Sequence, residues 1–390
     1  MADIKAFRAL HPDGDRINSW FVKHNAPAYE KQLPEIKKML EPKKGSLLTV
    51  ESTKTYKKNL NQFISSGLYQ EEKAPGIYIY EININGHQQY GVWAMASVED
   101  LLNGCMATHE KTLANRKDRL EEYRKDVGIE GAPVLLTYRP QAEINHLIEM
   151  VVQSGEGNVK PVIEKSYRLW KVDNAVLIEK FKLAFKKVSR VYVADGHHRL
   201  AAAQALHKTE PQWIMALYVA SNQIKISAFN RLVIPENKVS KTELFKVIEQ
   251  YFYTSAIPGN VPFKPNKLHC FGVFCEGKWY QLNLKPEKTE LSNETDVAIL
   301  QNKILQPVFH IDDPATSSFL HSYPSAQWDE MLSAASANPN VVIFSLYPMH
   351  VDQLIEQVEK ELNLPPKSTF IEPKILYGLL LYSHKPFDPS

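Results

Sequence analysis

Cysteine is scarce in this chain, which has only Cys105, Cys270 and Cys275 among its 390 residues. An odd number of cysteines, with no second pair to match Cys270 and Cys275, argues against a disulfide framework and against a zinc ribbon. Free cysteine usually behaves as a small buried hydrophobic residue. We therefore expect all three to fill the core.

Long apolar runs and an excess of one charge are also missing. No segment approaches the roughly 20 apolar residues that cross a bilayer, and the N-terminus lacks the apolar region of a signal peptide. The 46 basic and 44 acidic residues nearly cancel, so no basic arm or face indicates nucleic acid. The sequence predicts a cytoplasmic protein with no membrane partner and no evident nucleic-acid partner. It leaves a homo-oligomer open.

The first half of the chain predicts a mixed α/β sheet, because strand-like and helix-like segments alternate. Residues 76–96 alternate apolar and polar side chains around Asn85-Gly86, which is typical of a β-hairpin. The other predicted strands are 132–138, 167–172, 190–194 and 213–219. The predicted helices are 28–40, 56–64, 115–127, 142–152, 175–187 and 200–207.

The second half predicts an α+β mixture. A strand-like segment at 221–235 leads out of the first half, and we place the domain boundary near it, between residues 230 and 231. The predicted helices of the second half are 240–251, 296–305 and 350–362, and its predicted strands are 268–274, 279–284, 341–346 and 379–382.

The segment Asp195-Gly196-His197-His198-Arg199 lies between an apolar β-branched run and Leu-Ala-Ala-Ala-Gln-Ala-Leu, a strongly helical sequence. Gly196 permits the sharp turn that this junction needs. The N-terminus of the following helix attracts anions, and Arg199 could add a bidentate contact to phosphate. Asp195 is then either a helix N-cap or a carboxylate that holds a metal or accepts a proton. The alternative is an ordinary Asp-Gly turn.

The run from Val191 to Arg199 resembles the signature of a bacterial and archaeal family, domain of unknown function 1015, and the resemblance covers nearly the whole chain. Its other landmarks are Ile4-Lys5-Ala6-Phe7-Arg8-Ala9-Leu10, His109-Glu110-Lys111-Thr112 with Asp118-Arg119-Leu120, and Leu364-Pro365-Pro366-Lys367-Ser368-Thr369-Phe370 with Pro373-Lys374.

The strand–turn–helix of that family is similar to the phosphate-binding element of the ParB/sulfiredoxin-like superfamily. Relatives there bind nucleotides, and one branch phosphorylates free serine. The resemblance therefore implies a ParB/sulfiredoxin-like mixed-sheet domain over residues 1–230, which binds nucleotide or phosphate. A second α+β domain over residues 231–390 would follow it.

The chain departs from the family pattern in three places. Ala28-Tyr29-Glu30 replaces Pro-Tyr-Asp, which lengthens the acidic side chain. Leu200-Ala201-Ala202-Ala203 replaces Tyr-Glu-Thr-Ala, so any role of that glutamate is absent. Asn230-Arg231 replaces His-Arg, which removes one titratable group.

The resemblance changes the interpretation of two further segments. From the residues alone, His109 and Glu110 could supply a general base and a metal-holding carboxylate, or they could merely open a helix. Lys367, Ser368 and Thr369 lie among prolines, and composition alone predicts a surface turn for this segment. The segment lacks the glycines of a P-loop. The resemblance favours function in both segments. If the C-terminal segment folds back onto the first domain, Lys367 and Lys374 would close the site.

The preferred hypothesis is a nucleotide-dependent phosphotransferase, or kinase, that uses ATP or ADP with magnesium and acts on a small hydroxyl-bearing metabolite such as free serine. The expected catalytic residues are Asp195, His109, Glu110 and His198. The expected nucleotide-binding residues are Gly196, His197, His198, Arg199, Lys367, Ser368, Thr369 and Lys374. The expected metal ligands are Asp195 and Glu110.

Two rival functions are open. One is a nucleotide-binding regulatory module without phosphotransfer. The other is a hydrolase or a redox protein, and the lack of cysteine in the central loop argues against sulfiredoxin-like chemistry.

Overall fold

The computed structural model describes residues 1–12, 50–84, 86–109, 114–154, 158–159, 167–338, 340–362, 364–365 and 368–385. The chain forms two compact units by its internal contacts, Met1–Ile224 with Pro373–Ser390 and Lys225–Glu372. The C-terminal segment thus belongs with the first unit. The expected division into domains 1–230 and 231–390, with a nucleotide-binding first domain, stays a prediction. The predicted helix at 28–40, together with Asn85, Glu110, Lys111 and Lys367, lies outside the described residues.

The first unit is built on a mixed nine-stranded sheet of order β6-β11-β8-β12-β5-β4-β10-β9, with β1 paired to β5. Only the pairs β11–β6 and β12–β8 are parallel among its described ladders. The predicted mixed sheet is therefore confirmed. Its strands are β1 (Ile4–Lys5), β4 (Ile77–Ile84), β5 (His87–Ser97), β6 (Met106–Ala107), β8 (Val134–Tyr138), β9 (Asn158–Val159), β10 (Tyr167–Val172), β11 (Val191–Asp195) and β12 (Trp213–Ala220).

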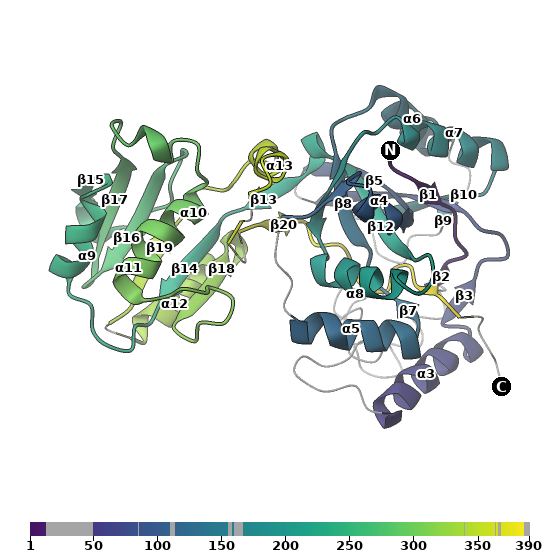
Figure 1. Cartoon of the computed structure of the whole chain (residues 1–390), viewed down its shortest axis with the longest axis horizontal. Coiled ribbons are helices and arrows are strands. Elements are labelled where there is room, and N and C mark those ends of the chain that lie inside the picture. Colours follow the sequence, from purple (N-terminus) through teal and green to yellow (C-terminus); the bar gives the residue numbers. More distant parts are fainter. Residues whose placement is uncertain are drawn as a thin grey trace. The chain divides into compact units, whose positions relative to one another are not determined.

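Helices cover this sheet, and α5 packs against α8 while α6 packs against α7 (Figure 1). Central strands such as β12 are apolar almost throughout because both faces of the sheet are buried. The helices are α3 (Val50–Ser65), α4 (Glu99–Leu102), α5 (Ala114–Asp126), α6 (Ala142–Ser154), α7 (Ala175–Lys186) and α8 (His197–His207), with the 3-10 turn η1 (Ser221–Gln223). Among the described residues no helix is long and apolar enough to cross a membrane.

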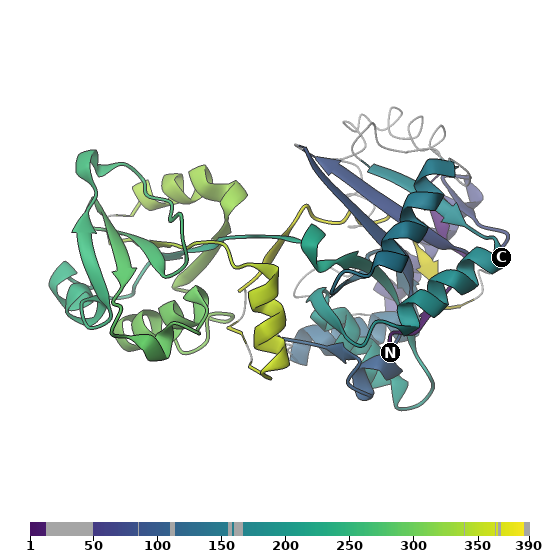
Figure 2. The same ribbon diagram turned by 90° about the horizontal axis from the view of Figure 1, so that it is seen from above.

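Two small ladders complete the first unit. β2 (Leu10–Pro12) pairs with β3 (Tyr69–Glu71), and β21 (Tyr382–Ser383) pairs with β7 (Ile129–Glu130). Figure 2 shows the C-terminal segment, in yellow, among the purple and blue elements of this unit. The last predicted strand, 379–382, is therefore displaced by a few residues. It pairs with β7, which lies about 250 residues earlier in the sequence.

The second unit has a six-stranded antiparallel sheet of order β15-β17-β16-β19-β14-β18. A separate ladder joins β13 (Lys225–Ser227) to β20 (Phe370–Glu372). The sheet strands are β14 (Phe229–Val233), β15 (Phe252–Ala256), β16 (Cys270–Cys275), β17 (Lys278–Leu284), β18 (Leu320–Pro324) and β19 (Val342–Ser345). The helices are α9 (Lys241–Ile248), α10 (Asp296–Leu300), α11 (Gln306–Phe309), α12 (Trp328–Ser336) and α13 (Val351–Glu359). A π-helix, η4 (Gln301–Leu305), connects α10 to α11, and the 3-10 turns are η2 (Pro258–Asn260), η3 (Thr289–Leu291) and η5 (Ser325–Gln327).

One buried carboxylate anchors the C-terminal segment to the first unit. Glu130 accepts from Arg124 and His384, and its Oε2 accepts from the Met215 N–H at 2.7 Å. Burial acts to raise the pKa of Glu130, but the charges of Arg124 and His384 outweigh it and lower the pKa to about 2. Glu130 is thus ionised throughout the neutral range and joins the C-terminal segment to α5 and β12 of the first unit.

We expect Glu130→Gln to lower the free energy of unfolding at pH 7 by about 3 kcal/mol, because Arg124 is then left buried beside a neutral group. The folded pKa of Glu130 lies below the unfolded value of about 4.5, so its contribution is present above pH 4.5 and is lost as pH falls toward about 2. Chemical denaturation at several pH values measures both effects. Glu149→Gln, on the exposed side of α6, is the control. A constant difference from pH 7 to pH 3 would contradict the role of the charge.

Candidate functional site

The centre of the first unit's site is the turn between β11 and α8. β11 carries a bulge against β8, where its register shifts between Val193 and Asp195. Such a bulge changes the direction of the side chains that follow it. Gly196 then takes a left-handed conformation, with φ 100° and ψ 20°, and α8 begins at once. The predicted strand–turn–helix is confirmed as a structure.

A side chain at Gly196 would lie close to Arg199 and Val134. An added Cβ would lie 2.9 Å from Nη2 of Arg199 and 3.2 Å from Cα of Val134. The left-handed backbone angle would also strain any other residue. The backbone conformation is therefore the main reason for glycine here, and an added Cβ would also require Arg199 to move.

Two details of this turn differ from the sequence-based prediction. The helix was expected to begin at Leu200, but α8 begins at His197, so His197, His198 and Arg199 lie in its first turn rather than in a loop. The N-cap is Gly196 and not Asp195, which makes the interpretation of Asp195 as a cap wrong. The reason is that the left-handed glycine completes the change of direction in a single residue.

Asp195 meets a cation from the far end of the chain. Its Oδ2 lies 3.3 Å from Nζ of Lys374, and both side chains are about half exposed, at 48% and 49%. Burial acts to raise the pKa of Asp195, but the charges of Lys374 and Arg199 outweigh it and bring the pKa below its ordinary value. The expectation that Lys374 folds back onto the first domain agrees with this contact.

His197 and His109 form a buried pair of rings. Their centroids are 4.5 Å apart and their planes meet at 86°. Burial, together with the neighbouring His197, lowers the pKa of His109 to about 3. Burial also lowers the pKa of His197 to about 4, although Asp195 opposes the shift. Both rings are therefore neutral at pH 7 and are weak bases.

Arg199 is partly buried on α8 and curls back over Gly196. It also lines a cavity of about 50 Å³ with residues of α5, β7 and the C-terminal segment, among them Leu120, Tyr123 and Tyr377. A cavity of this size holds a few water molecules and no larger ligand. A phosphate contact of Arg199 would therefore lie on the solvent side, toward Asp195.

The remaining predicted site residues lie outside the described residues or in the second unit. Glu110 and Lys367 lie outside the described residues, so their roles stay predictions. Ser368 and Thr369 belong to the second unit, where the Ser368 hydroxyl donates to the Pro365 carbonyl. Within the described part of the chain, no group of three or more His, Cys, Asp or Glu residues is arranged to hold a metal.

Sequence reasoning missed the surroundings of Arg199, above all Tyr377 and the pair Arg124–Glu130. An added Cβ at Gly131 would lie 2.3 Å from the ring of Tyr377, so the C-terminal segment packs tightly here. No local pattern could reveal this contact, because Gly131 and Tyr377 lie more than half the chain apart in the sequence.

We expect NMR titration to give pKa values near 3 for His109 and near 4 for His197, because both rings are buried. Between about pH 4 and 6.5 the unfolded chain then binds more protons than the folded chain, so stability falls as pH falls through this range. His109→Gln should lose part of that dependence in chemical denaturation, whereas His146→Gln, on the exposed side of α6, should keep it. A value above 6 for either buried ring would contradict the structure.

Comparisons with known proteins place the chain in a family but assign it no activity. No curated protein matches it. Among solved structures, it is similar to SbnI with a C-terminal truncation from Staphylococcus aureus, at 12% identity and a TM-score of 0.41, over 73% of this chain and 85% of that chain. A conserved hypothetical protein from Pyrococcus furiosus has 11% identity and a TM-score of 0.39, over 73% of this chain and 92% of its own.

A mutant free serine kinase in complex with ADP has 12% identity and a TM-score of 0.39, over 72% of this chain and 87% of that chain. The family comparison is more specific. The model described as Protein of unknown function (DUF1015) matches residues 16–307, well over half of the chain. The chain therefore belongs to the family Protein of unknown function (DUF1015).

Proposed function

We propose that the first unit is a nucleotide-dependent phosphotransferase that transfers the terminal phosphoryl group of ATP or ADP to a small hydroxyl-bearing metabolite. The observation that carries this proposal is the meeting of Lys374 with Asp195 at the start of α8. It joins a lysine ammonium group, a half-exposed carboxylate and a helix N-terminus in one place. These are the groups that phosphoryl transfer needs for positioning and for charge neutralisation.

The phosphates would bind at the first turn of α8. The amides of a first helical turn point out of the N-terminus, where the aligned peptide dipoles leave partial positive charge. The Arg199 guanidinium would donate charge-assisted hydrogen bonds to the phosphate, and the Lys374 ammonium would add a second positive charge. His198, partly exposed in the same turn, would donate a hydrogen bond to a phosphate oxygen.

Asp195 would act on the acceptor. Its lowered pKa keeps it ionised at neutral pH, so its carboxylate can accept the proton of the acceptor hydroxyl. The acceptor oxygen then bonds to the terminal phosphorus, and the bond from that phosphorus to the leaving nucleotide oxygen breaks. Little base strength is needed, because phosphoryl transfer passes through a loose transition state.

The buried rings of His109 and His197 would support this site through their packing and not through a charge. As neutral groups they add no repulsion toward a magnesium ion and no charge that competes with Arg199. Their packing fixes the first turn of α8 against the core, as positioning residues do. An anion bound nearby would raise the pKa of both rings, since it favours their protonated forms.

Magnesium fits this arrangement through Asp195, because Mg²⁺ in phosphate sites is usually held by one or two carboxylates together with substrate phosphates. When bound, it would neutralise phosphate charge. Glu110 is the second proposed ligand. Free serine is the first acceptor to test, since the strand–turn–helix resembles the ParB/sulfiredoxin-like phosphate-binding element, which has a serine-phosphorylating branch.

We expect the purified chain, incubated with ATP or ADP, magnesium and a pool of free amino acids, to form a phosphorylated amino acid that mass spectrometry identifies. Arg199→Ala should weaken nucleotide binding about tenfold to a hundredfold, as expected for the loss of a charge-assisted contact. Asp195→Asn should leave binding largely intact and lower the turnover rate about a hundredfold or more.

Lys208→Ala, at the opposite end of α8, is the matched control and should change neither quantity. Nucleotide binding that depends on Arg199 but yields no product with any acceptor would support the regulatory module instead. Nucleotide affinity unchanged by Arg199→Ala would contradict the proposed site itself.

A further inference from the structure

Among the described strands of the second unit, β15 forms an open sheet edge. β15 is an edge strand of the six-stranded sheet, and within the described chain only β17 pairs with it. Its residues Tyr253, Ser255 and Ala256 are exposed, with Tyr253 at 56%. An open edge with exposed backbone groups is a template for another strand.

The other described edge strands of the two large sheets are very short or contain a proline, and β15 has neither feature. The edge strands β6 and β9 of the first unit have two residues each. The opposite edge strand of the second unit, β18, ends in Pro324. β15 has five residues, Phe-Tyr-Thr-Ser-Ala, with neither a proline nor a charged side chain. It lacks the usual devices that discourage strand addition.

The ladder with β17 determines which backbone groups face outward. Ile257 N–H donates to Trp279, and Lys285 N–H donates to Tyr251. Because hydrogen-bonded residues alternate in an antiparallel pair, the backbone groups of Thr254 and Ala256 point away from β17. These two residues therefore offer N–H and C=O groups to a further strand.

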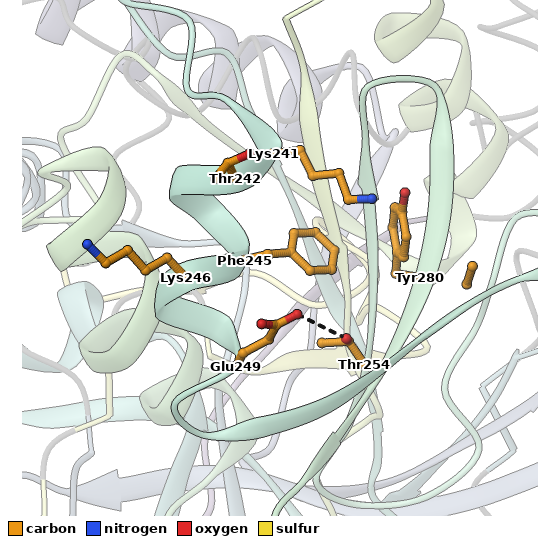
Figure 3. Close-up of a pocket in the computed structure, with 8 residues that line it drawn as sticks. Lys241, Thr242, Phe245, Lys246, Glu249, Thr254 and Tyr280 are labelled. Atoms are coloured by element: carbon orange, nitrogen blue, oxygen red, sulfur yellow. Dashed lines mark hydrogen bonds between the residues drawn. The ribbon is translucent and has the colours of Figure 1, made fainter.

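A groove lies beside this edge, between α9 and β15. Its volume is about 590 Å³, and its lining includes Phe245 of α9, Thr254 and Ala256 of β15, and Tyr280 of β17. Thr254 and Ala256 are two residues apart, so their side chains share the face that looks onto α9. Figure 3 shows Phe245 in the middle of the groove, between Lys241 and Glu249. A strand added to β15 would place every second side chain in this groove.

Opposite charges mark the two ends of the groove. Nζ of Lys241 lies 4.5 Å from the ring centroid of Tyr280, which pairs with Ala256 across the ladder. At the other end, Oε1 of Glu249 accepts from the Thr254 hydroxyl at 3.5 Å (Figure 3). Lys241 thus stands at the level of Ala256, and Glu249 at the level of Thr254. Along the direction of β15, the charges of Lys241 and Glu249 are therefore separated by the distance between side chains two residues apart in a strand.

We propose that this groove binds an extended segment of a partner protein, which adds as an antiparallel strand to β15. The segment carries an acidic side chain facing Lys241 and, two residues later, a basic side chain facing Glu249. The order follows from direction, because an antiparallel segment passes Ala256 before Thr254. A second copy of β15 does not fit, since Phe252–Ala256 has no charged side chain to meet Lys241 or Glu249.

Fluorescence anisotropy with the labelled peptide Thr-Val-Glu-Val-Lys-Val-Thr and the full chain measures this binding. Further peptides, in which Ile, Thr or Tyr replaces the valines, are tested in the same way. The version with Lys and Glu exchanged should bind about twenty-five times more weakly, about fivefold for each surface pair, since ~1 kcal/mol corresponds to about fivefold. Hydrogen exchange should slow at Thr254 and Ala256 when the first peptide is bound.

The double variant Lys241→Glu with Glu249→Lys should reverse the preference between the two peptides, which a merely structural role of these residues would not do. Thr254→Pro should abolish binding without unfolding the sheet, because its N–H points outward and proline is tolerated on such an edge. Thermal unfolding checks that each variant folds. No binding by any peptide of the set at millimolar concentration, equal binding of both charge orders, or protection elsewhere would overturn the proposal. So would self-association of the chain that Thr254→Pro removes.

Discussion

The left-handed turn at Gly196 is the constraint on which the first unit's site depends. A bulge turns the end of β11, and the glycine then joins strand to helix within one residue, in a left-handed conformation that other residues rarely adopt. This places His197, His198 and Arg199 in the first turn of α8. Asp195 is left at the end of the strand, half exposed. The chemistry available at the site follows from that placement, since a helix N-terminus favours negative charge and Arg199 adds to it.

Long-range contacts complete this local arrangement. Lys374 reaches Asp195 from the C-terminal segment, and that segment is held by the buried Glu130 together with Arg124 and His384. The charge at the site therefore depends on an anchor formed by distant parts of the chain. Loss of the anchor would remove a cation from the site without any change in the turn itself. In this way stability and the proposed phosphate binding are coupled.

The sequence predicted the parts of this protein that depend on local patterns. The hairpin of β4 and β5, the strand β10 and the helices α6 and α7 follow from side-chain periodicity. The start of α8 was misjudged, because three polar residues before an alanine-rich run look like a loop. Two-residue strands, the edge strand β15 and the packing of Tyr377 on Gly131 were missed. They arise from tertiary pairing and leave no periodic signal.

The central claim is that the junction of β11 and α8 binds phosphate. A crystal structure of the chain with a non-hydrolysable ATP analogue and magnesium tests it most directly. We predict a phosphate oxygen about 3 Å from the Arg199 guanidinium and from first-turn amides of α8, with Asp195 facing the terminal phosphate. A nucleotide bound elsewhere, with the turn and Arg199 unchanged and in contact with protein alone, would contradict the account.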